Sequence, residues 1–204
     1  KEALAATRAR DEGTDVPVQE RDLSMRVVAG VTLASMLPIG LLLWLFVRDT
    51  PIGHHAVGMV VVSILFVLLI GLLVASICGY MAGLIGASNS PISGVGIIVI
   101  LSSSLLILVI TGDTASTHPT ELTAYALFTT AVVFGIATIS NDNLQDLKTG
   151  QLVGATPWKQ QVALIIGVLF GSIVIPPVLE LLLNSFGFAG MEGYDPDQVL
   201  QAPQ

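Results

Sequence analysis

Residues 56–86 decide the fold class of this chain; they read AVGMVVVSILFVLLIGLLVASICGYMAGLIG, 31 residues without a single charge. A bilayer core about 30 Å thick is crossed by about 20 helical residues. In lipid the backbone of a span must satisfy its own hydrogen bonds, which a helix does. The stretch therefore predicts a transmembrane helix. At 1.5 Å per residue it would measure roughly 46 Å, which exceeds the hydrocarbon core.

Four further apolar segments share this character, and none shows the alternation of polar and apolar residues that a membrane barrel has over about 10 residues. They are Val27–Val47, Gly94–Thr111, Leu122–Ile139 and Gln161–Asn184. The chain is therefore predicted to be an all-α, polytopic membrane protein with about five transmembrane helices, one or two of them broken or re-entrant. Residues 1–26 are expected to form a hydrophilic loop and residues 185–204 an outer-side loop. We expect a central fragment of a longer protein, with the bilayer and the remaining helices as its partners.

Composition excludes several function classes. The chain is 53% hydrophobic and only 11% charged, with a mean hydropathy of +0.83, whereas soluble domains carry about 25% charged residues. Its formal net charge of -7 makes nucleic acid a poor partner. The one cysteine, Cys78, permits neither an internal disulfide nor a cysteine metal cluster. Phosphate-binding, zinc-protease and hydrolase motifs are missing from the sequence, so we predict no enzyme activity, no cofactor and no metal site.

The distribution of Lys and Arg predicts the orientation, because cytoplasmic loops are enriched in these residues. Placing the N-terminal loop inside puts seven of the eight basic residues on the cytoplasmic side, and the reverse orientation puts only Arg48 there. The seven are Lys1, Arg8, Arg10, Arg21, Arg26, Lys148 and Lys159. We therefore expect an integral protein of a bacterial inner membrane with a cytoplasmic N-terminal loop.

A first polar interruption follows the longest apolar segment. Its Gly-rich end leads into Asn89-Ser90-Pro91, where the residue before proline is pushed out of the helical region. This pattern fits a discontinuous, re-entrant transporter helix, and it fits equally well a tight hairpin between two ordinary spans. Under the first alternative Asn89 and Ser90 would bind substrate or gate its path.

A second interruption is denser in polar groups. If residues 141–148 are helical, Asp142 and Asp146 lie one turn apart on one face. Two carboxylates in a partly desolvated site disfavour joint ionisation, so at least one would bind a proton more readily. Glu180, near the end of the fifth segment, is a further candidate for proton coupling, although an interfacial position suits it equally well. The candidates for substrate binding or gating are Asn89, Ser90, Asn141, Asp142, Asn143, Gln145, Asp146 and Lys148.

Two alternatives stay open for this second block. It can be a solvated loop with ordinary caps, in which Gly150 ends one helix and Pro157 begins the next. Lys148 can also neutralise one of the carboxylates, which would make a structural ion pair more plausible than a proton site.

Residues 139–161, ISNDNLQDLKTGQLVGATPWKQQ, resemble the signature segment of the oligopeptide transporter (OPT) family, which includes the yellow stripe-like metal-chelate transporters. The turn SNSPISG at residues 88–94 and the ending APQ at 202–204 are similar to further segments of that family, so the resemblance extends over roughly residues 27–204. It implies a secondary active transporter for proton-coupled uptake of oligopeptides or metal chelates by alternating access. The competing hypothesis from composition alone is a non-transport polytopic assembly or scaffold subunit.

Overall fold

The computed structural model describes residues 17–18, 21–86, 90–112 and 114–187. Every regular element in these ranges is helical: α2 (Met25–Arg48), the 3-10 helix η2 (Gly53–His55), α3 (Ala56–Ile85), α4 (Ile92–Thr111), α5 (Thr114–Thr117), α6 (Pro119–Leu152) and α7 (Pro157–Phe186). Within the described residues, five helices are long and apolar enough to cross a membrane. The predicted all-α, polytopic fold class is thereby confirmed.

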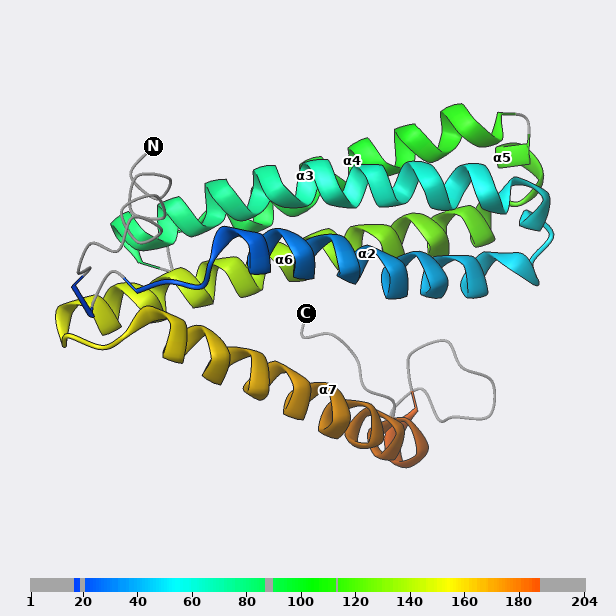
Figure 1. Cartoon of the computed structure of the whole chain (residues 1–204). Helices are drawn as coiled ribbons and strands as arrows, with labels where there is room; N and C mark the ends of the chain where they lie inside the picture. The colour runs from blue at the N-terminus through cyan, green and yellow to red at the C-terminus, as the bar shows by residue number, and fades with distance from the viewer. Residues whose placement is uncertain (1–16, 19–20, 87–89, 113, 188–204) are drawn as a thin grey trace. The chain divides into compact units, whose positions relative to one another are not determined.

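The chain divides into two compact units, Lys1–Gln160 and Gln161–Gln204. In the first unit, α2, α3, α4 and α6 lie side by side (Figure 1). The contact between α3 and α6 is the most extensive one. These two helices run parallel, because Tyr125 bonds to Ser63 near their beginnings and Ser140 bonds to Ala75 further along both.

Helix α4 runs antiparallel to α6. Ser103 and Thr130 share a hydrogen bond of 2.9 Å between their hydroxyl oxygens. Earlier on α4, Gly96 faces the ring of Phe134, which lies later on α6. Residue numbers thus fall along α4 as they rise along α6.

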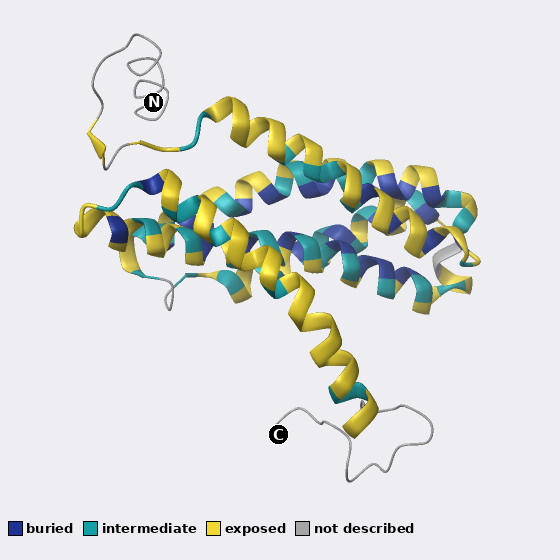
Figure 2. Ribbon diagram, turned by 60° about the horizontal axis from the view of Figure 1, so that its bottom comes forward, coloured by how far each residue is buried: buried dark blue, intermediate teal, exposed yellow. Residues whose placement is uncertain are grey.

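Buried side chains occupy the faces that these four helices turn toward one another (Figure 2). One cluster of buried residues lies toward the end of the bundle that contains Ile52 and Leu122. A second cluster continues along α3, α4 and α6. Its members are Phe66, Val67, Val74, Cys78, Val99, Val133 and Ala137, with Ile92 and Val95 packed against it.

Small residues let α3 and α6 approach closely. A Cβ added at Gly79 would lie 2.9 Å from Ser140 Oγ, and one added at Gly71 would lie 3.0 Å from Ile136 Cδ1. Between these two glycines, Ser140 Oγ donates to the carbonyl oxygen of Ala75 at 2.7 Å. Residues spaced by four form one row along a helix, so the small side chains of α3 receive a row of larger ones from α6.

Helix α6 differs from the prediction. The sequence analysis ends the fourth span at Ile139 and places an interruption before Asn141, but α6 is a single helix of 34 residues from Pro119 to Leu152. The reason is local: residues 136–149 contain neither proline nor glycine, so nothing stops the helix when its residues become polar. An apolar run marks the part of a helix inside lipid and not the helix ends.

The other bounds shift by a few residues. Helix α7 begins at Pro157, as predicted for a proline in a first turn, and α6 ends two residues beyond Gly150. Helix α3 stays regular through its Gly-rich end and stops at Gly86, which has φ 85°. Asn89 lies outside the described residues.

The short connection between α3 and α4 joins two complete spans. The two helices contain 30 and 20 residues, and both are long enough to cross a membrane. They lie next to each other in the bundle (Figure 1). The choice between a hairpin and a re-entrant segment depends on residues 87–89, which lie outside the described residues, so both alternatives stay open.

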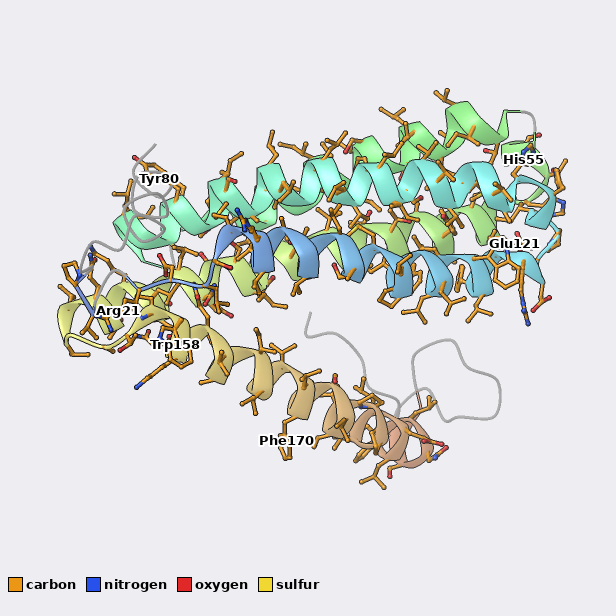
Figure 3. All side chains as sticks on the ribbon, viewed as in Figure 1. Arg21, His55, Tyr80, Glu121, Trp158 and Phe170 are labelled. Carbon is orange, nitrogen blue, oxygen red and sulfur yellow. The ribbon has the colours of Figure 1, made fainter. Side chains whose placement is uncertain are left out.

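Loops alternate between the two ends of the bundle. Arg21, Tyr80 and Trp158 lie toward one end, and His55 and Glu121 lie toward the other (Figure 3). The helix connections that the sequence analysis assigns to one side of the membrane therefore lie at one end of the bundle. Which end faces the cytoplasm stays a prediction from the basic residues.

Helix α7 supplies most of the described part of the second unit. It has 30 residues and contains Pro176 and Pro177 in its interior. Glu180, one turn after Pro176, has an exposed side chain.

Candidate functional site

Asn141 is the buried member of the polar stretch on α6. Its side chain is 3% exposed, and it continues a stripe in which Val133 and Ala137 are fully buried. A spacing of four keeps all three residues on one helix face. The helix therefore carries an amide into the bundle at the position where the apolar stripe ends.

The hydrogen bonds of Asn141 are incomplete. Its Nδ2 donates to Asp142 Oδ1 over 3.5 Å, and its Oδ1 has no hydrogen-bond partner. A carboxylate oxygen can only accept, so the neighbouring Asp142 fixes the amide with its nitrogen toward the carboxylate and its oxygen away from it. A buried acceptor without a donor costs about 1–3 kcal/mol. Asn141 Oδ1 is thus an acceptor at which a ligand would recover free energy.

The two predicted carboxylates stand in a different setting. Asp142 and Asp146 lie one turn apart on α6, as the sequence analysis expects of a helical stretch, but both side chains are exposed. The same holds for Gln145, while Asn143 is half-buried and its Oδ1 has no partner. The desolvation invoked for the carboxylate pair is therefore not supplied by this chain. It would have to come from a substrate or from helices elsewhere in the protein.

Lys148 does not neutralise either carboxylate. Its Nζ donates to Gln151 Oε1 at 3.0 Å. Among the ion pairs of the described residues, none joins Lys148 to Asp142 or Asp146. The alternative of a structural ion pair in this block is therefore not found among the described residues.

Ser90 supplies a further unpaired oxygen, on a different segment from Asn141 and Asn143. Its Oγ is buried and has no hydrogen-bond partner, and Ser90 stands just before α4. The antiparallel register from Gly96 and Phe134 brings the beginning of α4, which Ser90 directly precedes, toward the level of Asn141. The packing of Ile92 against the cluster that contains Ala137 agrees with this placement. The structure therefore brings Ser90 and Asn141 to the same end of the bundle.

The turn between α6 and α7 closes the same end. Gly150 is buried against the Gln160 side chain, so a Cβ at position 150 would collide with it. The backbone NH of Trp158 donates to the carbonyl oxygen of Arg21 at 3.1 Å, which ties the segment before α2 to the beginning of α7. Gln160 Nε2 is buried without a partner. Gln160 is not among the site residues predicted from the sequence, although it lies within the segment that resembles the OPT family.

The opposite end of the bundle contains an apolar pocket. Among the described residues, no group of three or more His, Cys, Asp and Glu side chains could hold a metal ion. A pocket of 280 Å³ lies there between α4 and α6, and it is lined by apolar side chains such as Ile107, Leu122 and Leu127. Its chemistry suits lipid or apolar side chains better than a peptide.

The comparisons with known proteins identify the family. The model of the family described as "OPT oligopeptide transporter protein" matches residues 1–204. This chain belongs to the OPT family. It is 47% identical over 192 residues to a Haemophilus influenzae protein named "Putative oligopeptide transporter". The aligned region covers 90% of this chain and 30% of that relative. The chain thus spans about a third of that relative's length. No solved structure matches the chain.

Membership of the OPT family confirms the resemblance that residues 139–161 indicated. A family of transporters also agrees with the expectation that the chain is not an enzyme. Together with the five apolar helices, it makes this chain a multi-pass segment of an integral membrane protein. The candidate site of this OPT chain is therefore defined by Ser90, Asn141 and the polar side chains that follow on α6.

Proposed function

We propose that the full-length protein is a secondary transporter that takes up oligopeptides, or metal chelates of similar chemistry, across a bacterial inner membrane together with protons. The N-terminal loop faces the cytoplasm in this proposal, so the end that contains Ser90 and Asn141 is the inner end. Support comes from the OPT family match over the whole chain and from the Haemophilus relative named as an oligopeptide transporter. The seven-to-one distribution of basic residues supports the orientation.

One observation carries the assignment of the site: α6 continues past its apolar part and keeps Asn141 buried in the bundle with an unsatisfied oxygen. Polar groups at membrane depth are expensive and are kept for function. In this proposal Asn89, Ser90, Asn141 and Asn143 contact the substrate or gate its path. The exposed residues Asp142, Gln145, Asp146 and Lys148 stand at the water-facing side of the same site.

The proton-coupling part of the proposal concerns three carboxylates. Asp142 and Asp146 share one face of α6, and both side chains are exposed on the surface of this chain. A substrate or a neighbouring helix that excludes water from this face would disfavour two adjacent negative charges and promote proton binding. Glu180 on α7 is the remaining candidate.

The test is uptake by the purified full-length protein in proteoliposomes, with and without an inward proton gradient. A labelled tripeptide and a labelled iron chelate serve as probes, and protein-free liposomes are the control. Gradient-dependent accumulation of either probe supports the proposal. Accumulation that ignores the gradient removes the proton-coupling part. If neither probe accumulates, transport is refuted for these substrate classes, and the scaffold hypothesis gains.

A further inference from the structure

We infer that Asn141 Oδ1 and Ser90 Oγ form an acceptor pair that binds the protonated amino terminus of a peptide substrate. The inference rests on the proposed function, because it names the chemical group that this site recognises in a transported peptide. It is carried by two buried oxygens without partners, by their common level in the bundle, and by the orientation of the Asn141 amide.

The level follows from the contacts between α4 and α6. The bond between Ser103 and Thr130 and the approach of Gly96 to Phe134 set an antiparallel register. Continuing it for somewhat more than one turn from Gly96 reaches the beginning of α4 at Ile92, near the level of Asn141, and Ser90 directly precedes that beginning. Neither side chain satisfies the other, since neither oxygen has a hydrogen-bond partner.

The orientation of Asn141 determines the kind of ligand. Its Nδ2 is directed at Asp142 Oδ1, so the group that remains for a ligand is the carbonyl oxygen. A hydrogen bond from this amide to a carboxylate polarises it and makes its oxygen a stronger acceptor. The hydrogen bond from Asn141 to Asp142 therefore makes the Asn141 oxygen best suited to a ligand that donates a hydrogen bond, and above all to a cationic donor.

A peptide's amino terminus fits these requirements. An ammonium group has three N–H donors and no acceptor, so it can donate hydrogen bonds to Asn141 Oδ1 and Ser90 Oγ at the same time. The carboxylate at the other end of a peptide would be repelled by Asn141 Oδ1 and by the nearby charge of Asp142. The pair therefore recognises the amino end of the substrate and rejects one whose amine is blocked.

The experiment compares two probes, trialanine and N-acetyl-trialanine, in proteoliposomes that contain the full-length protein. The wild type is expected to take up trialanine at least about tenfold faster at low concentration, since one charge-assisted hydrogen bond in a dry site is worth that much. Asn141→Leu, which keeps a branched side chain and removes the amide oxygen and nitrogen, should reduce this preference to about onefold or twofold. Ser90→Ala should reduce it by a smaller factor, because the Asn141 oxygen remains.

Ser102→Ala is the matched control on α4, because the Ser102 hydroxyl bonds only to carbonyl oxygens of its own helix. It should keep the wild-type preference. Ser90→Ala removes a single oxygen, so it keeps the inference testable if Asn141→Leu does not insert. Retention of the full preference in correctly inserted Ser90→Ala and Asn141→Leu proteins would overturn the inference and leave peptide transport standing. If the wild type takes up neither peptide, peptide transport itself fails, and the inference fails with it.

Discussion

Adding one methyl group at Gly79 tests whether the close approach of α3 and α6 holds the site in place. In Gly79→Ala the new Cβ would lie 2.9 Å from Ser140 Oγ and 3.1 Å from Leu144 Cγ. Neither neighbour can yield cheaply, because the Ser140 hydroxyl is bonded to Ala75 and Leu144 Cγ is a branching atom. The helices must therefore move apart or rotate.

Gly→Ala variants at two other glycines of α3 serve as references for the stability change expected in Gly79→Ala. Gly83 has open space around its Cβ position, so Gly83→Ala changes only the backbone preference. That preference favours Ala by up to about 1 kcal/mol and applies to both variants. Overpacking costs about 1–3 kcal/mol. Gly79→Ala should thus be less stable than Gly83→Ala by about 1–3 kcal/mol. Gly71→Ala should fall between them, since Ile136 Cδ1 is the mobile end of its side chain.

The assay is the thermal midpoint of the full-length protein in detergent, with tripeptide uptake in proteoliposomes as a second measurement. We expect the midpoints to decrease in the order Gly83→Ala, Gly71→Ala, Gly79→Ala, with a few degrees between the first and the last. Uptake should fall most in Gly79→Ala, because Asn141 directly follows the displaced Ser140. Equal midpoints and equal uptake for Gly79→Ala and Gly83→Ala would refute the close α3–α6 contact.

Three further predictions concern orientation, packing and proton coupling. Single cysteines in a Cys78→Ala background should be labelled from the cytoplasm at Ser24 and Thr149 and from outside at Thr117 and Gly193; labelling of Thr117 only from the cytoplasm would reverse the orientation. Ser140→Ala removes the hydrogen bond to the Ala75 carbonyl and should lower the free energy of unfolding by about 0.6–1.7 kcal/mol, which is observed as a lower thermal midpoint. Ser102→Ala should change the thermal midpoint little. Asp146→Asn should lower proton-driven uptake more than substrate exchange at equal pH. Equal loss of both would assign Asp146 to binding or folding, and no loss would make it a solvated residue.

The fold class could be predicted from the sequence because lipid imposes it. Runs such as Ala56–Ile85 have no alternative to a helix in a bilayer, and the proline at position 157 fits a first turn in any environment. Apolar content alone does not predict the continuity of α6, because it marks the part of a helix inside lipid. Residues 136–149 lack a helix breaker, and that signal was present in the sequence.

The burial of the site was predictable only in part. Val133, Ala137 and Asn141 are spaced by four, so helical periodicity alone separates the buried Asn141 from the exposed Asp142 once α6 is continuous. The contacts of Gly79 and of Gln160 cannot be predicted from the sequence, because they depend on which helices are neighbours. The unpaired oxygen of Ser90 was likewise invisible, because it follows from the register between α4 and α6.

The same contacts indicate which parts of this end are expected to move in a transport cycle. The backbone of α3 contacts side chains of α6 directly, at Gly79 and at the hydrogen bond from Ser140 Oγ to the Ala75 carbonyl oxygen. Such an interface has little freedom to slide, so Asn141 keeps its place relative to α3. Ser90 stands outside that interface, at the end of a short connection and ahead of the first turn of α4. A change in the separation of Ser90 and Asn141 therefore requires displacement at the beginning of α4. An ammonium group held by the proposed pair would oppose that displacement.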